Sequence, residues 1–403
     1  MPATPHIPHT DHTVRPLALV APVWAAGLGA SWAAVLAAFA VQAAAEAQGV
    51  ACLSDEFDNA SSLSNWTRIE QAESWPNDPL ETWNINTATP GAMTMIPHTV
   101  TWYQNYRGPL VFKSVTGDFA ITSSVRATGR DGVSVPSAQF SLAGLMLRTP
   151  RAITPATWTA GGENYVFLST GYGNANPARF QYEVKTTIDS DSQLVLSDAP
   201  GAESILQIVR IGAHIICLRQ PLGGAWIVHA RYRRDDMPAT LQAGLVSYTD
   251  WQKVSIFDPF VHNTSTLRPP LDPGVVDPNP FVPFNPDLRA EFGYARFAVP
   301  VVPGPFVGAD LSNPAAVSDA ELLTFLGAAL NTVASCNNCP ADLNNDTFVD
   351  DADFVLFAEA YNILDCTDPA MVPSCPADLN GDGFVEDADF VLFAAAYNEL
   401  ICP

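Results

Sequence analysis

A near-duplicate of 28 residues close to the C-terminus constrains the fold of this chain more than any other feature. Residues 339–366 and 375–402 agree at 22 of 28 positions and are offset by 36 residues. Each copy opens with Asp-x-Asn-x-Asp and continues into an apolar, aromatic stretch. A repeat of this kind indicates two copies of one supersecondary unit that bury their apolar faces together. We therefore expect residues 336–403 to form a small module of two loop–helix units.

The two loops carry the donor pattern of a calcium site. Ca²⁺ takes about six to eight oxygen ligands, which a loop supplies from its positions 1, 3, 5, 7, 9 and 12. Two loops in register predict two bound calcium ions. The candidate ligands, with position 7 acting through its carbonyl, are Asp342, Asn344, Asp346, Phe348, Asp350 and Asp353 in the first loop and Asp378, Asn380, Asp382, Phe384, Glu386 and Asp389 in the second.

The loops differ at position 6, where the backbone turns sharply. The second loop has Gly383 there, whereas the first has Thr347. A β-branched residue adopts positive φ only at a cost in free energy, so we expect the first site to bind calcium more weakly. The alternative for each loop is an acidic turn that precedes a helix and holds no metal.

Acidic residues are concentrated in this module. The chain has a net charge of −23, and residues 337–403 contain 14 acidic residues and no Lys or Arg. The other 28 acidic residues face 19 basic ones, so the rest of the chain contributes only −9. Nucleic acids and anionic membrane surfaces require a basic patch. The charge therefore argues against a nucleic-acid partner and fits cation binding.

Helices are expected after the loops, over residues 352–363 and 388–399, each with an aromatic stripe at i, i+3 and i+7. Their apolar residues extend beyond one face, so some apolar surface is left for the preceding segment or a partner to cover. A capping box at Ser318-x-x-Glu321 predicts a further helix over residues 319–334. Residues 301–335 would then be a linker that contains this helix.

These paired loops, each followed by an apolar helix, resemble a type I dockerin, an EF-hand-like module. The resemblance covers residues 339–402 and implies calcium binding and attachment to a cohesin-like or other surface protein. Loop positions 10 and 11, often Ser-Thr in the family, are Asp351-Ala352 and Asp387-Ala388 here. This departure concerns partner recognition and leaves the predicted calcium ligands unchanged.

Cysteine positions predict how the repeats are joined. A 12-residue helix is about 18 Å long, so a cysteine before a loop cannot bridge to one after the same helix. Antiparallel packing about a pseudo-twofold axis would place the start of one repeat near the end of the other. That arrangement predicts the disulfides Cys366–Cys375 and Cys339–Cys402.

The remaining cysteines leave more than one arrangement open. Cys336 could pair with Cys52, or Cys336-x-x-Cys339 could form half of a zinc or redox site. Cys217 lies in an apolar run and is expected to be a buried free thiol. Five of the seven cysteines follow residue 335, as is typical of a small exported module.

The N-terminal residues 1–47 are typical of a secretory signal. Arg15 precedes an uncharged apolar run from residue 17 to residue 45, which ends in Ala-Glu-Ala. We expect cleavage after Ala45 or Ala47. The alternative is an uncleaved anchor, because the run is long enough to cross a bilayer. The chain is therefore expected to be exported, either secreted or held at the cell surface.

Between residues 52 and 300 the pattern changes to short alternating runs bounded by Gly, Pro and Asp. Many such runs without a long helix predict an antiparallel β-sandwich of the jelly-roll kind. A proline-rich stretch, 259–286, is expected to be a long surface loop or a cover for a sheet edge. Strands are predicted over residues 118–129, 143–148, 164–170, 179–187, 204–212, 214–220, 226–233, 241–249 and 290–299, with a hairpin turn at 222–224.

The order of these runs resembles concanavalin A-like lectin/glucanase sandwiches. The resemblance rests on Asp-Glu-Phe-Asp at 55–58, Ala-Gly-Leu-Met-Leu-Arg at 143–148, Asn-Tyr-Val-Phe-Leu-Ser at 164–169 and Leu-Gln-Ile-Val-Arg-Ile-Gly at 206–212. It implies carbohydrate binding on a concave sheet, and some members of the family hydrolyse glycans. The fold class predicted for the whole chain is therefore mainly β, with a small α-helical, EF-hand-like module at the end.

No catalytic residues are assigned from the sequence. Retaining glycosidases of this kind place two carboxylates on one strand as Glu-x-Asp followed by a second Glu. The Glu56-Phe57-Asp58 segment lacks that second Glu. Sugars stack on aromatic rings and are fixed by a few polar groups. The candidate ligand-binding residues are Trp102, Tyr103, Tyr172 and Arg179.

The preferred function is an exported, carbohydrate-associated protein whose sandwich binds a glycan or another surface ligand and whose tail tethers or assembles it. The first alternative is a glycoside hydrolase for polysaccharide degradation whose catalytic carboxylates the sequence does not identify; loss of sugar release on substituting Glu183 or Glu163 would favour it. The second alternative is a structural cell-surface protein.

Overall fold

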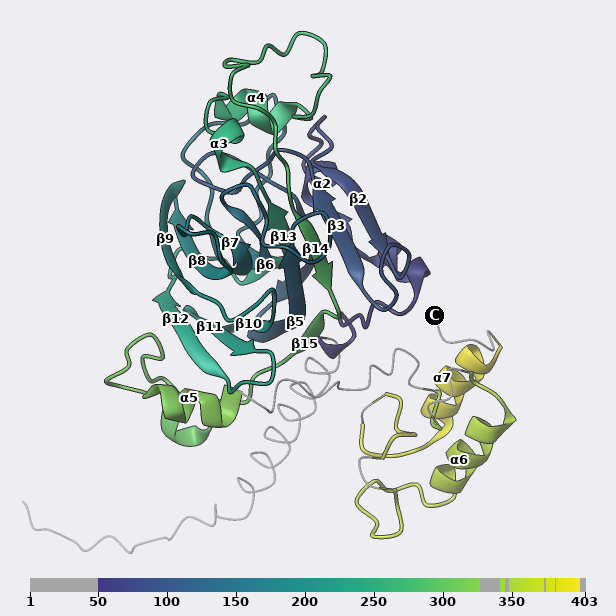
Figure 1. Ribbon diagram of the computed structural model, residues 1–403. Coiled ribbons are helices and arrows are strands. Elements are labelled where there is room, and N and C mark those ends of the chain that lie inside the picture. The colour runs from purple at the N-terminus through teal and green to yellow at the C-terminus, as the bar shows by residue number, and fades with distance from the viewer. Residues whose placement is uncertain (1–49, 327–340, 345–347, 373–374, 381, 399–403) are drawn as a thin grey trace, which may run out of the picture. The chain divides into compact units, whose positions relative to one another are not determined.

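Alternating apolar residues build two antiparallel sheets that pack face to face (Figure 1). The computed structural model describes residues 50–326, 341–344, 348–372, 375–380 and 382–398. The seven-stranded sheet runs in the order β1 (Thr67–Arg68), β4 (Leu110–Thr116), β13 (Thr240–Tyr248), β6 (Ser141–Arg148), β7 (Tyr165–Tyr172), β8 (Gln181–Ile188) and β9 (Asp191–Asp198).

The second sheet has eight strands. Its order is β12 (Ile227–Arg233), β11 (His214–Pro221), β10 (Glu203–Ile211), β5 (Phe119–Thr128), β14 (Arg289–Phe292), β3 (Met93–Pro97) and β2 (Leu80–Ile85), and β15 (Arg296–Ala298) also pairs with β5. Each of the nine predicted runs contains a strand, the last being divided between β14 and β15. The hairpin at 222–224 joins β11 and β12 as predicted.

Five strands were missed. These are β1 to β4 and β9. Strand β9 is an edge strand in which the exposed positions 191, 193 and 195 alternate with partly buried ones. Its side chains are mostly polar, because an edge strand with one solvated face needs few apolar residues. The sequence therefore resembles a loop at this point.

The main core lies between the sheets and follows the two-residue period of the strands. On β8, Tyr182 and Val184 belong to this core. Their neighbours Glu183 and Lys185 must therefore point to the other side of the seven-stranded sheet. Both are nevertheless buried, so loops and short helices cover this outer face.

The cover of that face comes from segments that the sequence presented as loops. They include α2 (Ile69–Ala72), α3 (Trp251–Val254) and α4 (Pro259–Thr264), and α3 and α4 lie at one end of the sandwich in Figure 1. The proline-rich stretch 259–286 was predicted to be a loop throughout, and α4 corrects that prediction. Asp258 caps this helix by accepting from the Phe260 N–H at 2.8 Å, and Pro259 at the first helical position is compatible with the helix.

The outer face of the eight-stranded sheet is covered by residues 304–326. They contain the 3₁₀ turn η2 (Gly304–Phe306) and α5 (Asp319–Leu326), and another 3₁₀ turn, η1 (Ala60–Asn65), lies near the start of the sandwich. Leu322 and Leu326 pack in one cluster with Val209 and Ile216. This segment was expected to be part of a linker, but its apolar residues form a layer on the sandwich.

Helix α5 begins where the capping box predicted. The Ser318 N–H donates to Glu321 Oε2 at 2.8 Å, and the Glu321 N–H donates back to Ser318 Oγ at 3.3 Å. The predicted helix extended to residue 334, and the part after residue 326 lies outside the described residues. None of the helices among the described residues combines the length and the apolar character needed to cross a bilayer.

The two C-terminal repeats pack against each other. Their helices are α6 (Asp351–Tyr361) and α7 (Asp387–Tyr397), within two residues of the predicted bounds. Phe357 and Phe393 stack between them, with ring centroids 4.9 Å apart. The Tyr361 hydroxyl donates to Asp387 Oδ1 and the Tyr397 hydroxyl donates to Asp351 Oδ1, each at 2.5 Å. These reciprocal bonds fit a pseudo-twofold arrangement of the repeats.

Two predictions about cysteines are tested. The Cys366–Cys375 disulfide is present, and Cys217 is a buried free thiol, as expected. Cys52 is disulfide-bonded. The predicted Cys339–Cys402 bridge, the role of Cys336 and the signal sequence over residues 1–47 lie outside the described residues.

Candidate functional site

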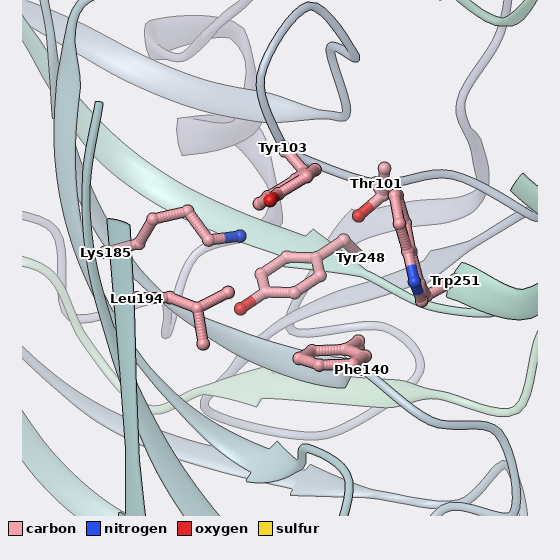
Figure 2. A pocket seen from close by; sticks show the side chains of 7 residues that line it. All are labelled: Thr101, Tyr103, Phe140, Lys185, Leu194, Tyr248 and Trp251. Carbon is pink, nitrogen blue, oxygen red and sulfur yellow. The ribbon is translucent and has the colours of Figure 1, made fainter. Parts of the chain in front are cut away.

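A small pocket opens on the covered outer face of the seven-stranded sheet (Figure 2). Its volume is about 150 Å³, below the range of about 300–1,000 Å³ that is typical of sites for drug-sized ligands. Four of the seven side chains that line it are aromatic. The lining residues are Thr101, Tyr103, Phe140, Lys185, Leu194, Tyr248 and Trp251.

Three different kinds of segment position these side chains. Tyr248 is the last residue of β13, and Lys185 lies on β8. Trp251 begins α3, immediately after the sheet ends. Tyr103 comes from the loop before β4, and its ring meets the Trp251 ring edge to face, with centroids 5.2 Å apart. The strands thus form the floor of the pocket, and the cover segments form its walls.

Three non-glycine residues at the walls have left-handed backbone conformations. Phe140, which lines the pocket, has φ of 54°, and Gln104 and Asp250, next to Tyr103 and Trp251, have φ of 50° and 68°. Such conformations cost free energy and often mark binding or catalytic sites. Hydrogen bonds to the Asp250 carboxylate offset part of the cost of its backbone conformation. Asp250 Oδ2 accepts from Thr99 Oγ1 at 2.7 Å and from the Asn285 N–H at 2.8 Å.

A buried ion pair lies at the pocket floor. Lys185 Nζ is 2.9 Å from Glu183 Oε1 and donates to the Trp102 carbonyl at 2.7 Å. Burial lowers the pKa of Lys185, and the charge of Glu183 opposes that shift. Burial, followed by the charge of Glu183, raises the pKa of Tyr248 well above 10, so the phenol stays protonated. Tyr248 shares a hydrogen bond of 2.9 Å with the Ser169 hydroxyl.

A second, larger ionic network lies under the same cover. Arg148 donates to Glu73 Oε1 and to Glu163 Oε2, each at 2.8 Å, while Arg107 contacts both carboxylates. Arg151 donates to Glu163 at 2.5 Å. Burial by itself raises the pKa of Glu163, but the charges of Arg148 and Arg107 outweigh it and lower that pKa to about 2.

Trp102 connects this network to the pocket. Its ring lies 5.9 Å from the Arg148 guanidinium carbon and meets the Tyr165 ring edge to face at 5.5 Å. Its indole N–H donates to the Pro109 carbonyl at 3.0 Å, and its carbonyl accepts from Lys185. The position of the Lys185 ammonium therefore depends on the loop that the network holds in place.

The structure brings one of the four predicted ligand-binding residues into the pocket. Tyr103 lines it. Trp102 is fully buried and offers no ring face to a ligand, so the structure corrects that prediction. Tyr172 is buried, with its hydroxyl on the Ala175 carbonyl at 3.3 Å. Arg179 forms an exposed ion pair with Asp198 at 2.8 Å, and neither of these two residues lines the pocket.

Sequence reasoning missed most of the floor. Lys185 lies two residues after Glu183 on one strand, so the period of the strand placed both on one face. The available signal was this pair of opposite charges at i and i+2 on a predicted strand. Tyr248 and Phe140 gave no such signal, because an aromatic residue at a strand end is usually part of the core.

The second C-terminal loop has the backbone expected of a cation-binding loop. Gly383 has φ of +93° at the sharp turn. Asp378 Oδ2 accepts from the Gly383 N–H at 2.8 Å, and Asn380 Oδ1 accepts from the Asp382 N–H at 2.8 Å. Asp382 Oδ1 accepts from the Phe384 N–H at 3.0 Å. The side chains at positions 1, 3 and 5 thus all face into the loop.

Position 12 has a different set of contacts. Asp389 is fully buried, and its carboxylate accepts from the N–H groups of Leu379, Asn380 and Glu386 at 2.8–2.9 Å. Asp353 makes the corresponding three contacts in the first loop. Asp346 lies outside the described residues.

The donors of the second loop suit a hard cation in their chemistry, because all of them are oxygens. Within the described parts of the chain, however, no three His, Cys, Asp or Glu side chains are grouped closely enough to hold a metal ion. The loop backbone and the oxygen donors suit a calcium ion, whereas the described carboxylates are not gathered into a metal site and the position 12 carboxylate accepts from the loop backbone. Calcium binding at this loop stays a prediction.

Comparison with known proteins gives only distant likenesses. No family model and no curated protein matches the chain. A functionally unknown protein from Saccharomyces cerevisiae shares 11% identity, with 60% of this chain and 99% of that chain covered and a TM-score of 0.37. A xylan β-1,4-xylosidase from Bacillus halodurans C-125 shares 13% identity, with 61% of this chain and 38% of that chain covered and a TM-score of 0.39.

A legume lectin-like domain from Entamoeba histolytica shares 5% identity, with 59% of this chain and 92% of that chain covered and a TM-score of 0.34. The chain spans well under half the length of the xylosidase that it matches. Likenesses with TM-scores this low carry no argument about function. The class of this protein, a two-sheet antiparallel β-sandwich followed by a small helical module, rests on its own strand pairing.

Proposed function

We propose that this chain is an exported, glycan-associated protein whose β-sandwich binds a saccharide in the outer-face pocket. The observation that carries the proposal is the pocket itself, where Tyr103, Phe140, Tyr248 and Trp251 surround a space of about 150 Å³. Aromatic walls with a few fixed polar groups are the usual environment of a bound sugar ring. The sandwich is assigned to the concanavalin A-like class on the sequence resemblance.

The strained backbone around the pocket supports a binding role. Positive φ at Phe140, Gln104 and Asp250 costs roughly 1–3 kcal/mol at each residue, and such strain clusters at functional sites. Non-glycine residues with positive φ also occur away from the pocket, for example Phe57 and Ser74. The strain is therefore compatible with a binding role and does not by itself separate a binding protein from the structural alternative.

The C-terminal module is assigned a tethering role that depends on calcium. In the second loop Asp378, Asn380, Asp382, Glu386 and Asp389, with the Phe384 carbonyl, would hold the ion. Bound calcium would reduce repulsion among carboxylates in a segment that carries −14 and would thereby stabilise the module. The partner is a cohesin-like or other surface protein, in keeping with export.

The binding proposal is tested with a glycan panel and two matched variants of the full chain. Trp251→Ala removes a wall of the pocket. Trp226→Ala removes another half-buried indole, which packs with the cluster on the eight-stranded sheet. We expect Trp251→Ala to abolish saccharide binding and Trp226→Ala to retain it. Equal binding by both variants, or no binding by the wild-type chain, would exclude the pocket as the site.

The same samples separate binding from hydrolysis. Incubation with each bound polysaccharide, followed by a reducing-sugar assay, distinguishes the two activities. Binding without release supports the proposed function. Release that Glu183→Gln or Glu163→Gln abolishes would instead support the glycoside hydrolase, with the affected carboxylate as its catalytic group.

A further inference from the structure

Two of the three lysines in this chain, Lys185 and Lys253, are buried, and they differ in how many oxygen atoms their ammonium groups contact. Lys253 Nζ has four oxygen neighbours within hydrogen-bond distance: both Asp277 carboxylate oxygens at 2.7 Å and the carbonyls of Asn279 at 3.0 Å and Val282 at 2.7 Å. An ammonium has three N–H donors. All the donors of Lys253 can therefore be used within the protein.

Lys185 has fewer partners among the described residues. Its ammonium contacts the Trp102 carbonyl at 2.7 Å and Glu183 Oε1 at 2.9 Å. The carbonyl hydrogen bond and the ion pair leave at least one N–H donor without an oxygen acceptor in the described part of the chain, and the nearest ring, that of Phe167, lies 4.6 Å from Nζ. Figure 2 shows Nζ between the rings of Tyr103 and Tyr248, at the pocket that Lys185 lines. The Lys185 side chain is only 2% exposed, and an unused donor on a buried charge is costly.

We infer that Lys185 is the specificity-determining residue of the pocket, and that its third N–H donates to an oxygen of a single, neutral sugar ring. This inference rests on the proposed saccharide-binding function. Burial of one such donor without a partner is best explained by a ligand that supplies the missing acceptor.

Electrostatics favours a neutral ring over an acidic one. Lys185 and Glu183 form a pair whose charges cancel, and the other six lining residues are uncharged. A ligand carboxylate would therefore bring an uncompensated negative charge into a buried site, which is strongly unfavourable. A ligand cation would meet the ammonium itself, which already lies 5.2 Å from the Tyr103 ring and 5.5 Å from the Tyr248 ring.

The size of the pocket favours one ring. A space of about 150 Å³ lies well below the volume of sites that enclose drug-sized ligands. The walls formed by Trp251 and Phe140 close the site on two sides, so the ligand is a terminal sugar or a side branch. A long glycan chain would instead require an open groove along the sheet.

The test uses isothermal titration of the full chain with methyl glycosides of glucose, galactose, mannose and xylose, and with methyl glucuronide and methyl galacturonide. We expect at least one neutral glycoside to bind and the matched uronide to bind at least about tenfold more weakly. Tighter binding of a uronide would overturn the neutral-ring assignment. Binding of longer oligosaccharides only would overturn the single-ring assignment.

The role of Lys185 is tested with Lys185→Met and with Lys253→Met as the matched buried lysine. Because a hydrogen bond from a charged donor is lost, affinity should fall at least about tenfold in Lys185→Met and stay unchanged in Lys253→Met. If Lys185→Met fails to fold, the double variant Glu183→Gln/Lys185→Met replaces it in the titration, because Glu183→Gln removes the carboxylate that Lys185→Met leaves without its ion-pair partner. Unchanged affinity in both Lys185 variants would refute the inference.

These results are distinguishable from a failure of the proposed function. If Trp251→Ala abolishes binding and the Lys185 variants do not weaken it, the pocket binds a saccharide but Lys185 does not contribute to its recognition. If neither the methyl glycosides nor the glycan panel binds to the wild-type chain, the proposed function and this inference both fail.

Discussion

Glu163 offers a sharp test of the ionic network that supports the pocket. Its carboxylate is 1% exposed, pairs with Arg148 and Arg151 at 2.8 and 2.5 Å, and also lies 3.2 Å from Arg107. Glu163→Gln keeps the shape of the side chain and removes its charge. The new amide N–H₂ would also face guanidinium donors that need acceptors. We expect this substitution to destabilise the β-sandwich strongly.

The magnitude follows from the pKa and from the burial. The pKa of Glu163 falls from 4.5 to about 2 on folding, and a difference of about 2.5 units corresponds to roughly 3 kcal/mol of stability at neutral pH. Breaking a buried ion pair by removing one partner costs about 3–5 kcal/mol. The two figures agree, so a loss of about 3 kcal/mol is expected at pH 7.

The assay is urea unfolding followed by tryptophan fluorescence. Seven of the nine tryptophans lie between residues 66 and 251, the other two lie in the predicted signal sequence and none lies in the C-terminal module, so the fluorescence of the chain without residues 1–47 reports on the sandwich. Glu56→Gln is the matched control, because Glu56 also pairs with an arginine through both oxygens, at 2.8 and 2.9 Å, but is 39% exposed. An exposed pair contributes only about 0–1 kcal/mol.

The pH dependence adds an independent check. A carboxylate whose pKa is depressed by folding contributes stability that is fully present above its unfolded pKa and is lost as the pH falls through its folded pKa. The difference between wild type and Glu163→Gln should therefore narrow from about pH 4.5 towards pH 2. A loss no larger than that of Glu56→Gln, or a difference that does not change with pH, would refute the reasoning.

Three further predictions follow from other groups. Burial lowers the pKa of both His262 and His229 to about 4, and His262 Nε2 accepts from the Thr101 N–H at 3.3 Å. Because the unfolded chain binds each proton first, the contribution of His262 to stability should fall by roughly 3 kcal/mol between pH 6.5 and 4. The difference in urea-measured stability between wild type and His262→Gln measures this contribution, and a difference that does not change with pH would contradict the prediction. Tyr361→Phe and Tyr397→Phe each remove one of two equivalent bonds and should lower the thermal unfolding temperature of the C-terminal module by similar amounts, whereas a large difference would argue against the pseudo-twofold. Calcium titration should show two unequal sites that become more alike in Thr347→Gly, and two equal sites in the wild-type chain would contradict the predicted defect.

The sheets were predictable wherever burial on one face imposed alternation. Strands β5 and β13 fall within one residue of their predicted bounds, and β8 within two, because their apolar residues repeat every two positions. Strand β9 was not predictable, since an edge strand with a solvated face carries mostly polar side chains. Helix α4 was hidden by its prolines, although Asp258-Pro259 is itself a helix-start signal.

The candidate site was less predictable than the fold, because its walls come from loops and short helices that cover the sheet. Tyr103 and Trp251 were recognisable as aromatic residues in loops, but only the three-dimensional cover decides which rings face a ligand. Trp102 and Tyr103 are neighbours in the chain, and one is fully buried while the other lines the pocket. A loop has no fixed period of side-chain direction, unlike a strand, so the sequence does not indicate which of two neighbouring rings meets the core.

The outer face of the seven-stranded sheet explains why charge and pocket occur together. An uncovered sheet face carries polar side chains in water, where Glu183, Lys185 and Arg148 would need no partners. Here the loop before β4 and helices α3 and α4 exclude water, so each charge must find an opposite charge or a carbonyl. The Arg148 network achieves this within the protein, and Lys185 does so only in part. Where the cover is incomplete, the remaining Lys185 donor on β8 and the rings of Tyr103 and Trp251 from the cover line the pocket, so the proposed site needs both a strand and the cover segments.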